Sequence, residues 1–524
     1  MKILFLMTDP GNLKYYYETL RALLRNGHCV HVAFFNIERQ AKYMLHEKLK
    51  AEFPESFSWG QASGRRSDVW QALCVAYSWA IDYLFFLVPY FRNAHRLRER
   101  VEIRIIPSFR WLMTRCPLFK TPGGVAFMAR LLRMIDEAIP ASRKMKKFIR
   151  HQKPDIVLVT PLLSHSGLQS EYLRAARKLG VSTAHCVTSW DNLTSKGALR
   201  GNPDFMIMWN ETQKKEAMEL HGVSSDRIIV TGAQYFDEWF MHKPSRSRKA
   251  FCEINGLLPD RLILLYMCSS NFMAPNEKDF VLKWIRTIRN SESRELAEAG
   301  ILIRPYPEYV DQWKNVDFSV FGNVVVWPPA GEYPLTEETK SNFFDSIYHS
   351  FAVVGVNTTA MIESAIIGRC VLSVLAPELN ESQSNTIHFN YMRQENGGFL
   401  YLAKDIDEHV EQLKDILTNG DRMVVQIGEF VKHFARPHGM SQACVPIVAK
   451  AIEGLKGRPP FPDPLTFSKV LWRGMLYPLA LALLCGRLVT RHRKKEQKIE
   501  RKRLFRAAAD HGGDPLEYIR GEKR

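Results

Sequence analysis

The stretch "VVGVNTTAMIESAIIGRCVLSV", residues 353–374, decides the expected fold. It begins with an apolar run typical of a buried strand and breaks at three small polar residues, Asn357, Thr358 and Thr359. It continues as an apolar helix that carries one acid, Glu363, and ends in a second apolar run. A strand, a helix and a second strand in this order form the repeating unit of a doubly wound parallel sheet.

The same alternation of strand and helix patterns occurs in two series along the chain. The first begins with "KILFLM" and resumes after an insertion with "DIVLVT"; the second begins with "RLILLYMCSS". We therefore expect an α/β protein with two Rossmann-like domains, at residues 1–240 and 245–455. Such sheets bind ligands at the carboxyl ends of their strands, so the expected site is the cleft between the two domains.

Positive charge is concentrated in two segments of the chain. The formal net charge is +17; residues 92–150 hold 15 Lys and Arg against 4 Asp and Glu, and residues 487–524 hold 13 against 6. Basic segments of this kind indicate a polyanionic partner, either nucleic acid or an anionic membrane. Nucleic-acid binding is not expected, because neither segment interleaves aromatic residues with the basic ones or carries a known nucleic-acid-binding motif.

Two apolar segments lie next to these basic ones. Residues 69–91 contain a single charged residue, Asp82, and introduce a predicted helical insertion at 69–150. The favoured interpretation is an interfacial membrane helix, with a buried core helix and a true membrane span as alternatives. Residues 465–524 are predicted to form an apolar helix followed by a polybasic tail, a composition typical of a peripheral membrane anchor.

Cysteine usage indicates a reducing compartment. The nine cysteines are scattered, without CxxC pairs or ligand spacings for zinc. No metal or other cofactor is expected. Asp405, in an Asp-x-Asp pattern, is interpreted as a helix cap with Glu408 as its partner. "MKILFLMTDPGN" has the pattern of a strand and loop instead of a signal peptide. The expected location is therefore the cytoplasm, peripheral on the inner face of the cell membrane.

Asn357, Thr358 and Thr359 have a pattern suited to binding phosphate. They fall where a strand ends and a helix begins, and a helix N-terminus presents unpaired N–H groups and partial positive charge. Glu363, one turn further on, is placed to accept hydrogen bonds from the two hydroxyls of a ribose. The simpler alternative is that Asn357 is only an N-cap and Glu363 only a favourable charge near the helix start.

This arrangement resembles the GT-B superfamily of glycosyltransferases and UDP-N-acetylglucosamine 2-epimerase. In that superfamily a small-residue phosphate loop precedes a helix with a ribose-binding Glu, followed by a Gly-Lys/Arg-Pro-Val strand. "GRCVLSV" matches the last element, with Cys370 in place of Pro. "IRPYPEY" (303–309) resembles the Arg-Pro-His-Pro segment of surface-polysaccharide transferases, with Tyr306 in place of His. The resemblance implies that Arg304 faces the diphosphate of the donor.

The resemblance also implies catalytic and binding residues in "TSWDNLTSKG" (188–197). Asp191 is the first candidate for the catalytic base that an inverting transfer requires, and His165 the second. Both also fit simple turn or helix-start roles. The other candidates are the acceptor-loop residues Trp190, Asn192 and Lys196 and the donor-contact residues Gly11, Gly232 and His388.

Together these patterns predict a metal-independent glycosyltransferase at the cytoplasmic membrane face. It would move a sugar from a nucleotide-sugar to a saccharide acceptor, lipid-linked or free. Two alternatives stay open: the same fold acting as a nucleotide-sugar 2-epimerase or CDP-glycerol-type phosphotransferase, and a non-catalytic membrane scaffold.

Overall fold

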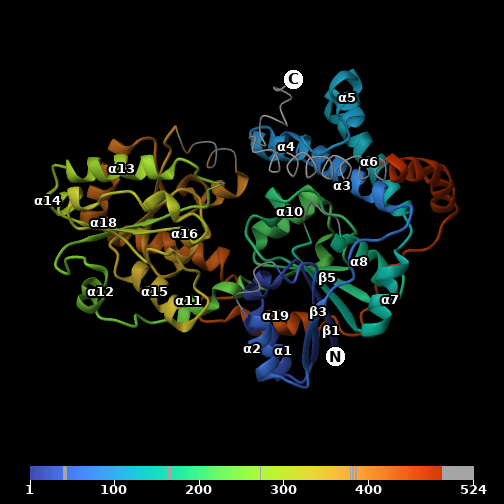
Figure 1. Cartoon of the computed structure of the whole chain (residues 1–524), viewed down its shortest axis with the longest axis horizontal. Helices are drawn as coiled ribbons and strands as arrows, with labels where there is room; N and C mark the ends of the chain where they lie inside the picture. The colour runs from blue at the N-terminus through green and yellow to red at the C-terminus, as the bar shows by residue number, and fades with distance from the viewer. Residues whose placement is uncertain are drawn as a thin grey trace, which may run out of the picture.

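The protein contains two parallel β-sheets, each covered by helices on both faces (Figure 1). The structure is a computed structural model that describes residues 1–38, 44–162, 168–271, 273–377, 379, 383 and 386–486, with the backbone alone at 420–424.

The sheet of the first domain has the strand order β3-β2-β1-β4-β5-β6-β7, with every pair parallel. Its strands are β1 (Lys2–Met7), β2 (Cys29–Phe34), β3 (Phe57–Gln61), β4 (Ile156–Thr160), β5 (Ser182–Cys186), β6 (Phe205–Met208) and β7 (Ile228–Val230). Its helices include α1 (Tyr17–Arg25), α2 (Leu45–Glu52), α7 (Arg143–Gln152), α8 (Leu168–Arg177), α9 (Asn192–Ser195), α10 (Glu211–His221) and α11 (Asp237–Met241). The central strands are buried on both faces, which explains why they are continuous apolar runs.

The second domain repeats this plan with the strand order β10-β9-β8-β11-β12-β13, again fully parallel. Its strands are β8 (Ile263–Met267), β9 (Gly300–Arg304), β10 (Val324–Val326), β11 (Ala352–Gly355), β12 (Cys370–Val374) and β13 (Leu400–Ala403). Its helices are α12 (Arg248–Asn255), α13 (Glu277–Arg289), α14 (Arg294–Ala297), α15 (Glu337–Tyr348), α16 (Thr359–Ile366) and α18 (Ile406–Phe434). The predicted two-domain parallel architecture is therefore present.

The last helix of the predicted second domain belongs to the first domain instead. Helix α19 (Cys444–Glu453) packs on α1, and its apolar residues Val448 and Ile452 lie in the core beneath that helix. Glu453 accepts hydrogen bonds from Asn26 and His28 of the first domain. The expectation that all of 245–455 forms the second domain is wrong for this helix, because its apolar face completes the other core.

The insertion contains α3 (Gln71–Phe85), α4 (His95–Glu102), α5 (Pro107–Arg115) and α6 (Pro122–Ala138). Eleven of the 15 residues of α3 are buried, in a cluster with side chains of α4 and α6. The favoured expectation of a membrane-interfacial helix is therefore wrong for α3, and the core alternative is correct. Its single acid, Asp82, is buried against Arg200 at 2.7 Å.

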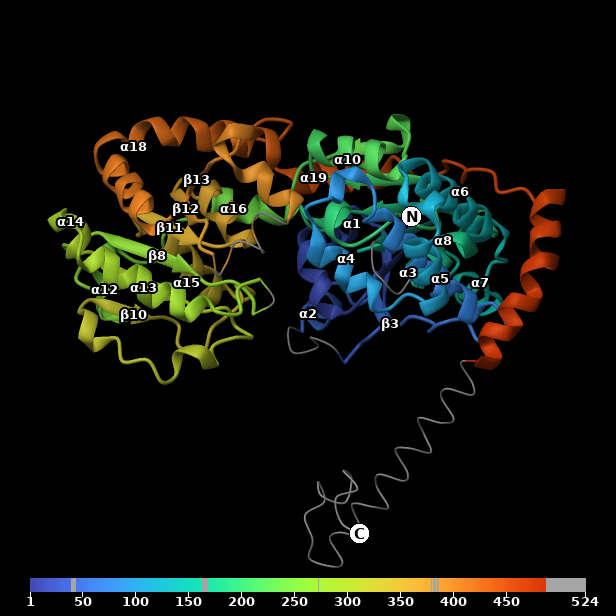
Figure 2. The ribbon, with the colours of Figure 1, turned by 90° about the horizontal axis from the view of Figure 1, so that it is seen from above.

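The helix Phe467–Gly486 lies along the outside of the first domain, beside the insertion (Figure 2). Its one packed edge contacts the insertion through Tyr477 against Trp70 and through Arg473 Nε, which donates to Ala138 O at 2.6 Å. Most of its other side chains are exposed. By length and composition it is the one helix in the described part of the chain that could cross a membrane.

Candidate active site

A cavity of about 250 Å³ lies between the two domains at the carboxyl ends of both sheets. The first domain contributes Lys14, Tyr15, Thr188, Ser189, Trp209 and Tyr235, which follow β1, β5, β6 and β7. The second domain contributes residues at or after the ends of β8, β9, β10 and β11, including Cys268, Arg304, Tyr306, Glu332, Tyr333, Thr358, Thr359 and Glu363. This is the edge at which parallel sheets bind their ligands.

The N-terminus of α16 opens into this cavity. Thr358 is the N-cap, in an extended conformation, and its hydroxyl accepts a hydrogen bond from Ala360 N at 3.4 Å. Thr358, Thr359 and Ala360 all line the cavity. The first N–H groups of a helix have no partner within the helix and carry partial positive charge, so this end can bind an anion such as phosphate.

Glu363 lies one turn into α16 and faces the same cavity. Its side chain is buried, and among the described residues only Trp239 Nε1, at 3.3 Å, donates a hydrogen bond to it. Burial raises the pKa of Glu363 to about 7, although Lys14 and the Trp239 hydrogen bond oppose this increase. The carboxylate thus lacks donors that a bound polyol would supply.

Arg304 also reaches the cavity, at the end of β9, but it is already paired. Its Nη2 atom lies 2.8 Å from Glu332, and Nη1 donates to Ser346 Oγ at 3.1 Å. The guanidinium also lies over the rings of Trp327 and Phe343. Arg304 is therefore held rigidly at the cavity wall, with Glu332 neutralising much of its charge.

Lys14 is a cavity residue that sequence analysis missed. It lies in the 3-10 turn η1 (Pro10–Tyr15), next to the rings of Tyr15 and Tyr333, and its Nζ atom forms no ion pair or hydrogen bond with the described residues. It is thus a cation from the first domain available to an anion at α16. The sequence feature that could have identified Lys14 is its position in the loop after the first strand, at the carboxyl edge of the sheet.

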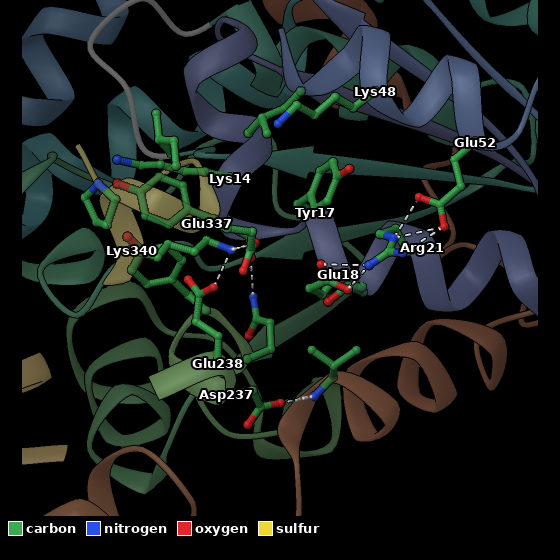
Figure 3. A pocket seen from close by; sticks show the side chains of 18 residues that line it. Lys14, Tyr17, Glu18, Arg21, Lys48, Glu52, Asp237, Glu238, Glu337 and Lys340 are labelled. Carbon is green, nitrogen blue, oxygen red and sulfur yellow. Dashed lines mark hydrogen bonds and ion pairs between the residues drawn. The ribbon is translucent and has the colours of Figure 1, made fainter. Parts of the chain in front are cut away.

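The cavity continues into a second, strongly charged cavity of about 250 Å³ (Figure 3). Both cavities share Lys14, Tyr15 and Tyr235. Most charged side chains here pair with one another: Arg21 with Glu18 and Glu52, and Lys340 with Glu238 and Glu337. Lys14 and Lys48 are the cations in this cavity that form no ion pair with the described residues.

The predicted base Asp191 lies beside the main cavity, behind Ser189. Its carboxylate accepts hydrogen bonds from Ser189 and Ser195, each at 2.6 Å, and pairs with Lys196 at 2.9 Å. Burial acts to raise the pKa of Asp191, but Lys196, His388 and the two hydroxyls outweigh it, so the pKa lies well below its usual range. A carboxylate this acidic is a weak base at neutral pH.

Trp190 and His388 meet at the interface between the domains. Their rings form an edge-to-face contact with centroids 4.6 Å apart, and both are buried. Burial lowers the pKa of His388 to about 4, so the ring is neutral at pH 7. Neither side chain lines the main cavity, so sugar stacking by Trp190 and donor contact by His388 stay predictions that this arrangement does not support.

Two further candidates, Asn192 and Gly232, make contacts within the fold. Asn192 Oδ1 accepts hydrogen bonds from Thr188 and Ser189 and closes their turn. Gly232 has a φ of +87° and lies against Cys444, whose Sγ would be 2.3 Å from an added Cβ. The glycine therefore allows the start of α19 to pack closely against this loop. These contacts account for both residues without a role in the cleft, and neither residue lines the cavity.

Gly11 and Asn357 are also not among the residues that line the cavity. Gly11 lies in η1, where its N–H donates to Asp9, and the cavity is lined by Lys14 and Tyr15 of the same turn. Asn357 is buried and donates to Thr386 Oγ1 at 3.0 Å. His165 lies outside the described residues. Of the predicted donor residues, the structure thus brings together Arg304, Thr358, Thr359 and Glu363.

Within the described ranges, no group of three or more His, Cys, Asp or Glu side chains could hold a metal ion. Asp405 is the N-cap of α18, where it accepts a hydrogen bond from Glu408 N at 2.8 Å. The Glu408 side chain in turn accepts from Lys404 N at 2.7 Å. The Asp-x-Asp pattern is therefore a helix cap, as its sequence context indicated.

No family model matches this chain, and no curated protein sequence matches it. Among solved structures, it is similar to a putative UDP-N-acetylglucosamine 2-epimerase from Listeria monocytogenes, at 12% identity and a TM-score of 0.47, covering 89% of this chain and 99% of that one. It is also similar to a glycosyltransferase from Rickettsia africae, at 10% identity and a TM-score of 0.46, covering 87% and 99%.

A third similar structure is the wall teichoic acid polymerase TagF, at 10% identity and a TM-score of 0.42, covering 86% of this chain and 88% of that one. These proteins are of the classes that the sequence resemblance names. At such identities and TM-scores, the similarity assigns no activity or residue role to this chain.

Proposed function

We propose that the protein is a glycosyltransferase that uses a nucleotide-sugar donor at the cytoplasmic face of the membrane. One observation carries this proposal: a single cavity between two Rossmann-like domains joins a helix N-terminus, a buried carboxylate and an unpaired lysine from the facing domain. These three groups are complementary to a diphosphate esterified to a ribose.

In this proposal the diphosphate binds at Thr358 and Thr359, between the N–H groups of α16 and the ammonium of Lys14. The ribose hydroxyls donate to Glu363. Lys14 and the helix N-terminus stabilise the charge that develops on the departing nucleoside diphosphate, which is the role of a metal ion in other transferases. The reaction is therefore expected to persist in excess chelator.

The acceptor is proposed to enter through the charged cavity of Figure 3. This cavity adjoins the diphosphate end at Lys14, so an acceptor hydroxyl there would approach the donor from the first domain. The exposed side chains of the helix Phe467–Gly486 and the basic character of 487–524 support attachment to an anionic membrane. A lipid-linked acceptor fits that location.

Donor binding is expected to strengthen as pH rises through about 7. Ribose hydroxyls donate to the ionised form of Glu363, whose pKa is about 7 in the free protein. Below this pH, binding must first release a proton, so the dissociation constant should rise by up to tenfold per pH unit; well above it, affinity should be constant. Calorimetric titration with a nucleotide-sugar between pH 5.5 and 8.5 measures this. Both phosphates of that ligand are esterified and do not titrate in the range, so a flat profile would contradict the ribose assignment.

The identity of the released product tests the proposed activity. The protein is incubated with UDP-, CDP- and GDP-activated sugars and CDP-glycerol, together with a detergent extract of bacterial lipids as acceptor. Glycosyl transfer releases a nucleoside diphosphate, phosphotransfer releases a nucleoside monophosphate, and epimerisation leaves the nucleotide attached to an altered sugar. Release of diphosphate that depends on the extract supports the proposal; either of the other products, or none, contradicts it.

A further inference from the structure

Two adjoining cavities in the first domain lie outside the candidate active site. One, of about 170 Å³, lies between α3 and α6; the other, of about 510 Å³, lies beside α8 and the segment 200–202. They share four lining residues, namely Tyr77, Arg133, Leu199 and His221. The two cavities therefore adjoin along one boundary.

The smaller cavity is apolar. Its walls include Ile81, Leu84 and Phe85 from α3 and Val125 and Ala129 from α6. The imidazole of His221 is part of this wall, stacked on Phe85 with centroids 5.0 Å apart. Burial lowers the pKa of His221 to about 4, and both of its ring nitrogens are hydrogen-bonded to backbone groups. Apart from Arg133, at the boundary with the larger cavity, the wall is thus uncharged at neutral pH and suited to a hydrocarbon chain.

The larger cavity is cationic. Six basic side chains line it against three acidic ones, Asp136, Glu137 and Asp463; the basic set is Arg133, Arg174, Arg177, Arg200, Arg227 and Lys469. Four of these six cations pair with carboxylates, namely Arg174 with Asp136, Arg177 with Asp204, Arg200 with Asp82 and Lys469 with Asp463. Arg133 is exposed and forms no hydrogen bond or ion pair with the described residues. It is therefore an available cation at the boundary with the apolar cavity.

The C-terminal helix, which is the proposed membrane contact, lies beside the cationic cavity. Lys469, in the first turn of the helix Phe467–Gly486, lines the cationic cavity. The helix lies beside the insertion (Figure 2), and Leu476 and Ala480 pack against Leu73 and Ile139 there. Its exposed apolar side chains include Leu471, Met475 and Leu479. A helix of this kind rests at the boundary between headgroups and acyl chains.

We propose that the two cavities together bind one anionic phospholipid, with an acyl chain between α3 and α6 and the phosphate in the cationic cavity beside Arg133. The inference rests on the proposed membrane location but not on the donor site. An apolar cavity next to a cationic one is complementary to an amphiphile with these two parts and to neither part alone.

This lipid is an anchor, distinct from the acceptor. Asn202 and Arg227 of the cationic cavity precede β6 and β7, so they lie at the amino edge of the sheet. The candidate active site lies at the carboxyl edge, where Thr188 and Trp209 follow β5 and β6. A phosphate bound at the amino edge is therefore on the far side of the sheet from the reacting groups.

Lipid titration of the full chain in neutral detergent tests the proposal, with native mass spectrometry to count bound lipids. Phosphatidylglycerol, phosphatidylcholine with the same chains, diacylglycerol and glycerol phosphate are compared. We expect one tightly bound phosphatidylglycerol and at least tenfold weaker binding of the other three. Equal binding of phosphatidylcholine would overturn the anionic site, and equal binding of glycerol phosphate would indicate a free-phosphate site without a chain.

Three variants locate the site. Arg133→Glu should weaken phosphatidylglycerol binding at least tenfold, and Ala129→Trp, which fills the apolar cavity, should abolish it. Arg130→Glu is the matched control, since Arg130 is also exposed on α6 but lines neither cavity. Equal losses in Arg130→Glu and Arg133→Glu would overturn the proposal. Nucleotide binding is measured on the same samples: if it persists without lipid binding, only this inference fails, and if it is absent, the proposed function fails separately.

Discussion

Replacing Asp82 with alanine is expected to destabilise the first domain by about 3–5 kcal/mol, because the change leaves a buried guanidinium without its counter-charge. Asp82 is fully buried and pairs with Arg200 at 2.7 Å. Its Oδ1 atom also accepts the Ala198 N–H at 2.9 Å. Gly197 allows this close approach, since a Cβ there would lie 2.4 Å from the same oxygen. The single acid of an otherwise apolar helix thus anchors the segment that follows Lys196.

Thermal unfolding measures this effect, and a loss of this size should lower the midpoint of a domain of this length by roughly 10 °C. Glu102→Ala is the control, because it removes an ion pair with the exposed Arg110 in the same insertion and should cost less than about 1 kcal/mol. The double substitution Asp82→Leu with Arg200→Met should recover much of the loss, since it removes both buried charges. If Asp82→Ala and Glu102→Ala unfold at the same temperature, the anchoring role is wrong.

Replacing Glu363 with glutamine is expected to weaken nucleotide binding by about 100-fold, or roughly 3 kcal/mol, without destabilising the protein. Hydrogen bonds to a charged group contribute about 1.5–3 kcal/mol each, and glutamine offers the ribose one uncharged acceptor. The folded-state pKa of Glu363, about 7, lies above its ordinary value of 4.5, so the buried carboxylate destabilises the folded protein above pH 4.5. The ligand-free variant should therefore unfold at the same temperature as the native protein, or a higher one, at pH 8.

Glu337→Gln is the matched control for this prediction. Glu337 lies in the adjoining charged cavity, is largely exposed and pairs with Lys340 at 3.6 Å. The same chemical change there should leave nucleotide affinity within about twofold. A Glu363→Gln variant that binds nucleotides as tightly as the native protein would show that Glu363 is not a ligand.

The grouping of Thr358, Thr359 and Glu363 in one cavity could be predicted from sequence because these residues are close together along the chain. The strand, Thr358, Thr359 and Glu363 fall within one βαβ unit, so local pattern and periodicity place all of them at one sheet edge. The two-domain architecture could be predicted for the same reason, because each strand and helix has a local pattern of its own. Local patterns determine which edge of a sheet a loop occupies.

Contacts between distant segments could not be predicted in this way. A tryptophan in a polar loop is typical of a sugar-stacking site, but Trp190 packs on His388, which lies in the other domain. Gly232 follows β7, so its place in the sheet predicts a position near the cleft. However, the absence of a Cβ at Gly232 makes room for Cys444. The α3 helix is apolar enough for an interface with lipid, and its burial depends on α4 and α6. In each case a contact with another element of the fold decides the role.

The position of Lys14 in the cavity could not be predicted from sequence either. One lysine in a turn carries no pattern, and its position opposite α16 becomes visible only when the two domains face each other. The same holds for Asp191, whose neighbours Lys196 and His388 make it strongly acidic. Protonation behaviour depends on three-dimensional surroundings, which motifs do not specify.

Nucleotide binding to the purified full chain is the most direct test of the central claim. The chain is titrated with UDP, CDP, GDP, CMP and dTDP in the presence of EDTA, with calorimetry and thermal unfolding as readouts. We predict that one nucleoside diphosphate binds with 1:1 stoichiometry, and at 100 times its dissociation constant it should stabilise the protein by about 2.7 kcal/mol. A folded protein that binds none of the five, with or without added divalent metal, would contradict the donor site and favour a non-catalytic scaffold.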